Sequence, residues 1–193
     1  MMDQRTLIII GVAVIAVVVV IAALLIERKR RSDRLKQQFG PEYDRTLRLH
    51  GDARHAEAVL LEREKRVEKL SIRPLSPVDR DRYAIEWANV QKLFVDDPSM
   101  AVTQAEKLVT AVMVARGYPI SDFEQRAADI SVNYPALVQN YRSAREITWR
   151  HAQGQSSTED LRQSMVYFRS LFDELLDSRK TTKIGVTHER IAS

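Results

Sequence analysis

The chain has 193 residues with no cysteine, 30 basic and 26 acidic residues, and a formal net charge of +4. The absence of cysteine excludes disulfide bonds, thiol catalysis and cysteine-ligated metals, and the length allows one membrane helix and one domain with its own core. The positive excess lies at the two ends, because residues 37–177 hold 19 basic and 22 acidic residues and carry −3. A mildly acidic domain argues against nucleic acid as a partner, since a duplex-binding surface needs a basic face.

An apolar run occupies residues 7–26 and contains no charged or polar side chain. As a helix it spans roughly 30 Å, the thickness of the hydrocarbon core of a bilayer. A cleaved signal peptide is the competing interpretation, but the run is longer than a usual signal and meets a basic cluster without a small-residue cleavage site. We predict a single transmembrane helix, with residues 1–36 forming the anchor and its basic juxtamembrane extension.

The basic residues around this run are unevenly distributed. Arg5 is alone before it, whereas six basic residues follow within ten positions: Arg28, Lys29, Arg30, Arg31, Arg34 and Lys36. Because basic residues near a span tend to stay in the cytoplasm, we expect a single-pass protein of the cytoplasmic membrane, with a short N-terminus outside and the C-terminal domain inside. The six residues are also candidates for contact with anionic lipid headgroups, although setting the topology is the simpler interpretation.

Residues 37–70 are rich in charge and predict a connector helix that begins after Gly40. Gly51 and Asp52 are expected to bend or recap it. Its thin apolar seam consists of Leu49, Ala53, Ala56, Leu60, Val67 and Leu70. A narrow seam buries little area, so we expect this segment to be less buried than the later helices and to connect them to the membrane or face a partner. The alternative is a sixth amphipathic helix that lies along the bundle.

Proline, glycine and capping residues divide the rest of the domain. Pro74 and Pro77 indicate a linker that uncouples the connector from the later helices, with Ser76 capping the first of them. Further breaks are expected at Asp97-Pro98, Gly117-Tyr118-Pro119 and Gly154, and capping boxes at Ser121 with Glu124 and Ser156 with Glu159.

The segments between these breaks carry apolar residues at helical spacing. Two examples are Tyr83, Trp87, Val90 and Phe94, and Leu161, Met165, Phe168, Phe172 and Leu175. We therefore predict an all-α fold in which residues 77–177 form a compact bundle of five helices, one of them short. Residues 178–193 are expected to be a disordered basic tail.

Residues able to carry chemistry form no known catalytic pattern. His50 and His55 would point about 140° apart on one helix, and neither they, His151 nor His188 has metal-ligand spacing. The carboxylates alternate with basic residues, as on solvated helix faces, and Asp97 is expected to act as a helix cap. The tyrosines and tryptophans that fit the apolar stripes are assigned to the core. The sequence thus predicts no catalytic, cofactor-binding or metal-binding residue, and no enzyme activity.

Several short motifs resemble an uncharacterised family of bacterial single-span membrane proteins with a helical soluble domain. They are FGPEYD at 39–44, HGD at 50–52, RVEKL at 66–70, IRPL at 72–75, FVDDP at 94–98, RGYP at 116–119 and TEDLR at 158–162. The resemblance covers nearly all of the soluble part and implies a bacterial cytoplasmic membrane. It implies no activity and no catalytic residue.

The sequence supports three hypotheses of function. The leading one is a membrane-anchored, non-catalytic interaction module that presents grooves between helices to a protein partner. The second is a self-associating structural membrane protein, a homo-oligomer in which residues 42–70 pair with their own copy. The third is an enzyme without a recognised motif, which would require a deep polar pocket.

Overall fold

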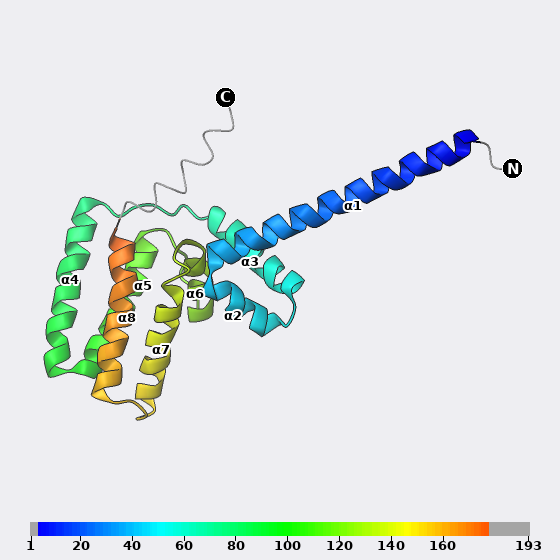
Figure 1. Ribbon diagram of the computed structural model, residues 1–193. Coiled ribbons are helices and arrows are strands. Elements are labelled where there is room, and N and C mark those ends of the chain that lie inside the picture. The colour runs from blue at the N-terminus through cyan, green and yellow to red at the C-terminus, as the bar shows by residue number, and fades with distance from the viewer. Residues whose placement is uncertain (1–3, 178–193) are drawn as a thin grey trace.

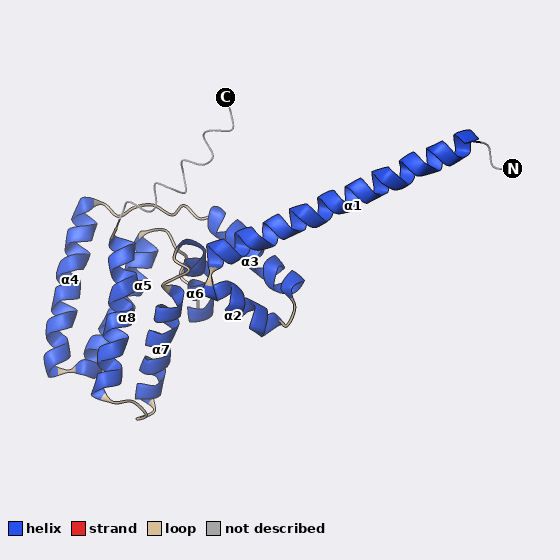
Figure 2. Ribbon diagram, in the orientation of Figure 1, coloured by secondary structure: helices blue, strands red, loops and turns tan. Residues whose placement is uncertain are grey.

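The computed structural model describes the backbone of residues 4–177 and the side chains of residues 14–177, and this part of the chain holds eight α-helices and no strand (Figure 2). The predicted all-α class is therefore confirmed. The predicted disordered tail and His188 lie outside the described residues.

The first helix, α1 (Gln4–Phe39), is one continuous element that projects away from the rest of the molecule (Figure 1). Its large apolar side chains between Val14 and Ile26 are each between 51% and 65% exposed. Within the described residues, no helix has an apolar stretch long enough to cross a membrane. The predicted transmembrane helix has no support from this part of the chain and stays a prediction.

Residues 37–70 form two helices and the end of α1, not the single connector helix that we expected. Gly40, at φ +48°, separates α1 from α2 (Pro41–His50), and Gly51, at φ +74°, separates α2 from α3 (Ala53–Glu68). Asp52 caps α3 by accepting hydrogen bonds from two backbone amides of its first turn, so the predicted recapping at Gly51 and Asp52 is confirmed.

The break at Gly51 also corrects the expected placement of two histidines. His50 ends α2 and His55 lies in the first turn of α3, so the two are not on one helix. Their rings stack with centroids 4.7 Å apart. The expected 140° separation was wrong because it assumed an unbroken helix.

The N-terminal helices form a small second core with α6. Leu35 and Phe39 at the end of α1 are fully buried with Tyr43 and Leu60, and Val132 of α6 packs against them. In the predicted seam, Ala56, Leu60 and Val67 are buried and Leu70 is half-buried, whereas Leu49 and Ala53 are exposed. The weaker burial expected of this segment therefore holds in its first part and fails at Ala56, Leu60 and Val67, where α3 lies against other helices of the chain as the amphipathic-helix alternative expects.

The remaining five helices form the bundle, as the sequence predicted. They are α4 (Pro77–Asp96), α5 (Pro98–Ala115), the short α6 (Phe123–Asn133), α7 (Val138–Ala152) and α8 (Thr158–Leu176). Helices α4, α5, α7 and α8 lie side by side, and α6 sits at the end nearest α2 and α3 (Figure 1). In the main core, Trp87 of α4 stacks on Phe172 of α8 with ring centroids 4.6 Å apart.

Helix caps agree with the predictions at two positions and differ by one residue at two others. Ser76 and Asp97 accept amide hydrogen bonds at the starts of α4 and α5, as expected. Asp122 caps α6 instead of Ser121, and a capping box links Ser157 with Asp160 instead of Ser156 with Glu159. In both places two adjacent residues are good caps. The residue at which the helix begins is therefore decided by which apolar side chains of the helix reach the core.

The linker of residues 71–76 is docked on the bundle, so the predicted uncoupling is wrong. The Arg73 amide donates to the Arg116 carbonyl at 2.9 Å, and the buried Arg116 guanidinium donates back to the Arg73 carbonyl at 3.3 Å. A Cβ atom on Gly117, which has φ +99°, would lie 2.5 Å from the Ser71 carbonyl oxygen. Only glycine permits so close an approach here.

Candidate functional site

An open groove of about 730 Å³ lies over α7. Helices α6 and α8 contribute Glu124 and Tyr167 to its walls, and α2 contributes Arg45. A second groove of about 480 Å³ shares Arg45, Glu124 and Arg142 with the first. The two hollows therefore meet where α2, α6 and α7 come together.

Four arginines line the larger groove, and they differ in how closely each is paired with a carboxylate of the protein. Arg145 holds Glu106 through two hydrogen bonds of 2.7 and 2.9 Å. The Arg45 guanidinium is 3.8 Å from a Glu42 carboxylate that other arginines already occupy, and Arg150 is 4.0 Å from Glu146. Arg45 and Arg150 are 29% and 38% exposed, so both can still receive a carboxylate from outside.

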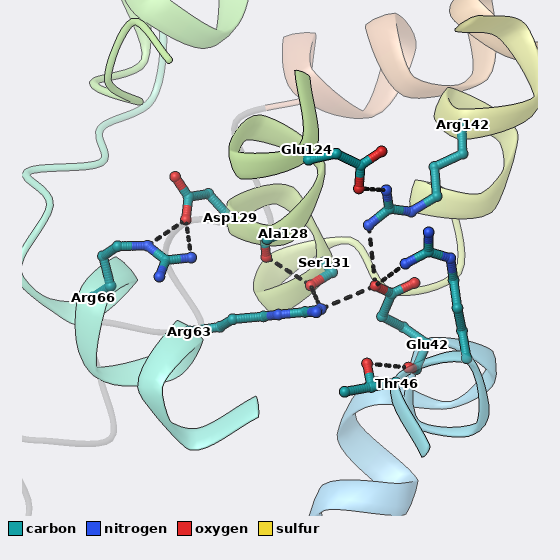
Figure 3. A network of polar contacts seen from close by, with 10 residues as sticks. Glu42, Thr46, Arg63, Arg66, Glu124, Ala128, Asp129, Ser131 and Arg142 are labelled. Carbon is teal, nitrogen blue, oxygen red and sulfur yellow. Dashed lines mark hydrogen bonds and ion pairs between the residues drawn. The ribbon is translucent and has the colours of Figure 1, made fainter. Parts of the chain in front are cut away.

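The fourth arginine, Arg142, connects the groove surface to a buried ion-pair network (Figure 3). It donates to the exposed Glu124 at 2.6 Å and to the buried Glu42 at 3.2 Å. Its side chain is only 9% exposed, and its Nε atom has no hydrogen-bond partner within the described part of the chain. Arg142 is thus a buried cation with one replaceable surface partner.

Glu42 is the centre of that network. Its side chain is 1% exposed and accepts from Arg63 at 2.9 Å and from Arg142, while Thr46 donates to its backbone carbonyl at 2.8 Å. Arg63 also donates to the Ser131 hydroxyl at 3.4 Å. The Glu42 carboxylate thus joins α2 to α3 and α7, and its two arginine partners extend the network to Ser131 and Glu124 of α6 (Figure 3).

Burying the charged groups of this network removes them from water, and their mutual ion pairs have to offset that loss of solvation. Desolvation lowers the pKa of the Arg63 guanidinium, whereas the hydrogen bond and charge of Glu42 act in the opposite direction. A charge pair withdrawn from water is stable only when both partners stay in place. Removing either partner would therefore leave the other charge buried without compensation at the contact between the N-terminal helices and the bundle.

A second buried carboxylate fastens α3 to α6. Asp129 is 1% exposed and accepts from Arg66 at 2.8 and 2.7 Å (Figure 3). It also accepts from Gln125 at 2.9 Å. The expectation that carboxylates lie on solvated faces was wrong for Asp129 and Glu42. Both lie on the sides of α6 and α2 that face other helices.

Three aromatic side chains line the groove, and Trp149 is exposed at 56% whereas Phe123 and Tyr167 are half-buried. The apolar stripe predicted for this segment did not include Trp149, whereas Trp87, which lies on its predicted stripe, is buried as expected. On α7 the buried face carries Tyr141, Ala144 and Ile147, which leaves Trp149 outside the stripe. The position of Trp149 outside this helical repeat of apolar residues was the sequence signal that could have identified it as exposed.

The six predicted lipid-contact residues fall into two groups. Arg28, Lys29, Arg30 and Arg31 are exposed on α1. Arg34 is held instead by Glu64 through bonds of 3.2 and 2.9 Å, and the Lys36 ammonium lies 5.6 Å from the Tyr43 ring centroid. The last two flank Leu35, whose burial turns this part of α1 toward the domain.

The groove offers hydrogen-bond donors and apolar area to a ligand. Guanidinium groups stay protonated and donate hydrogen bonds, and an exposed indole offers apolar area. Among the described side chains, no three histidine, aspartate or glutamate residues are grouped closely enough to hold a metal ion.

No protein-family model, curated protein sequence or solved structure matches this chain.

Proposed function

We propose that the protein is a membrane-anchored, non-catalytic interaction module that binds a protein partner through the groove over α7. The observation that carries this proposal is the half-exposed Trp149 set among partly exposed arginines. Tryptophan and arginine are the residues most enriched where protein interfaces concentrate their binding energy.

The exposed half of α1 supports the anchor. The apolar run of residues 7–26 extends on both sides of Val14, where the described side chains begin. From Val14 to Ile26 its large side chains lie in the open and pack against no other helix of the domain. Apolar surface on this scale needs a cover, and a bilayer of roughly 30 Å matches the length of the run. The resemblance to bacterial single-span proteins supports the same membrane.

The basic asymmetry supports a cytoplasmic domain. One basic residue precedes the apolar run, and six follow within ten positions. A reporter enzyme active only outside the cytoplasm and fused after Ser193 should therefore be inactive, and one active only inside should work. The opposite pair of results would refute the orientation.

Partner binding can be tested by site-specific photocrosslinking in cells. A photoreactive residue at Gln139, exposed in the groove, should give a crosslinked product of higher mass. The same residue at Gln91, exposed on α4, is the matched control and should give none. Equal products at both positions, or none at Gln139 and neighbouring groove positions, would contradict the proposal.

Self-association through residues 42–70 is less well supported. Half of the seam expected to pair with a second copy is covered within the chain, because Ala56, Leu60 and Val67 are buried against its own helices. A crosslink from Gln139 to the protein itself would revive the homo-oligomer.

A further inference from the structure

The groove has the opposite charge sign to the domain that carries it. Arg45, Arg142, Arg145 and Arg150 line it, against Glu124 and Glu146, which gives the lining residues a formal +2, while Glu42 and Glu106, which do not line it, pair with Arg142 and Arg145. Residues 37–177 as a whole carry −3. A local positive patch on an acidic surface favours an acidic ligand that fits the groove, and it repels extended polyanions that must also pass over the rest of the surface.

Glu124 occupies the position on Arg142 that a carboxylate of such a ligand would take. Its side chain is 69% exposed, yet it holds the nearly buried Arg142 at 2.6 Å. Glu42 holds the other end of the same guanidinium from inside the protein. A carboxylate that arrives from solvent can replace Glu124 without exposing Glu42, because the two acids contact different nitrogen atoms of Arg142.

Trp149 supplies the apolar part of the same surface. It lies on α7 one turn beyond Arg145 and next to Arg150 in sequence, and all three line the groove. Side chains four positions apart are neighbours on a helix. Because Arg145, Trp149 and Arg150 all line the groove, a ligand held there by carboxylates can reach the indole with an adjoining side chain.

We propose that the groove binds an acidic protein segment that carries an apolar side chain beside its carboxylates. One carboxylate replaces Glu124 on Arg142, others contact Arg45 and Arg150, and the apolar side chain packs on Trp149. This inference rests on the proposed function and names the chemistry of the partner. A peptide fits better than a nucleic acid because it pairs separate carboxylates with separate guanidinium groups and needs no wide basic face.

A display library of random twelve-residue peptides, selected on the full chain in detergent micelles, tests the proposal. Enriched peptides should be rich in aspartate and glutamate and contain a large apolar residue. Their affinity should fall about 30-fold in Trp149→Ala and about 10-fold in each of Arg45→Glu and Arg150→Glu. Circular dichroism should show unchanged folding, because these side chains are at least partly exposed.

The Glu124→Gln variant gives the most specific result. Removal of the internal competitor should raise the affinity for the acidic peptides about threefold to tenfold, which a purely structural role of Glu124 does not predict. Two controls on α4, Arg82→Glu and Ile85→Ala, change exposed residues outside the groove and should leave binding unchanged.

Other results would overturn the inference. Enrichment of basic or neutral peptides, absence of any enriched peptide, or acidic peptides whose binding is unaffected by the groove variants would each do so. A crosslinked partner at Gln139 together with any of these results would leave the interaction module standing and remove only its acidic ligand. Loss of both the crosslink and the peptides would remove the proposed function as well.

Discussion

The buried carboxylate of Glu42 should be among the most sensitive polar positions of the domain. In Glu42→Ala, Arg63 and Arg142 keep their charges with side chains that are only 10% and 9% exposed. Removing one partner of a buried ion pair typically costs about 3–5 kcal/mol, because the remaining charge is left without compensation. Arg142 retains Glu124, so most of the cost should come from Arg63.

Two further variants separate charge from shape. Glu42→Gln keeps the volume and one acceptor, so its cost should be smaller, roughly 2 kcal/mol. The double variant Glu42→Leu, Arg63→Met removes both charges of the closest pair. It should be more stable than the sum of the two single changes predicts, by about 0.5–3 kcal/mol. Thr46 should be unaffected, since it donates to the backbone carbonyl of Glu42.

Urea unfolding of the full chain in micelles, followed by far-UV circular dichroism, measures these differences. Asp173→Ala is the matched control, because Asp173 is 58% exposed and its 3.4 Å pair with Arg169 lies on the surface. Exposed pairs contribute at most about 1 kcal/mol. A cost below 1 kcal/mol for Glu42→Ala, or one equal to the control, would refute the network as the fastening between α2 and the bundle.

Two other positions give independent predictions. Trp87→Ala should cost roughly 3–5 kcal/mol in the same unfolding assay, because Trp87 is 5% exposed and stacks on Phe172; Trp87→Phe should cost much less, since the buried indole N–H has no hydrogen-bond partner among the described residues. The pKa of Asp160 is lowered by hydrogen bonds from the Ser157 amide and hydroxyl, so its stabilisation is present above the ordinary value of 3.8 and is lost as the pH falls through the lower folded value. The difference in melting temperature between the wild type and Asp160→Ala should therefore shrink below pH 3.8, and a difference that grows there would contradict the capping box.

The helix boundaries of the bundle were predictable because local chemistry determines them. Ser76-Pro77 and Asp97-Pro98 each combine a side chain that accepts an amide hydrogen bond with a proline suited to a first turn. Both begin helices where expected. At Asp122 and Ser157 two neighbouring residues could serve as caps, so local chemistry did not decide between them.

The candidate site was less predictable because it depends on contacts between distant parts of the chain. Glu42 meets Arg142 one hundred positions later and Arg63 twenty-one positions later. A charged residue among other charged residues looks solvated by periodicity alone. Only the packing of α2 against α7 shows that Glu42 is enclosed.

The continuity of α1 constrains how the groove is presented if the apolar run lies in a bilayer. From Ile26 to Phe39 the helix rises about 20 Å at about 1.5 Å per residue, without a break. Leu35 and Phe39 are fully buried at its end, and Arg34 pairs with Glu64 beside them. In that case the helix that leaves the bilayer continues unbroken into the small core around Phe39. A tilt of the membrane helix would therefore turn the whole domain and its groove together, unless the small core around Phe39 opens.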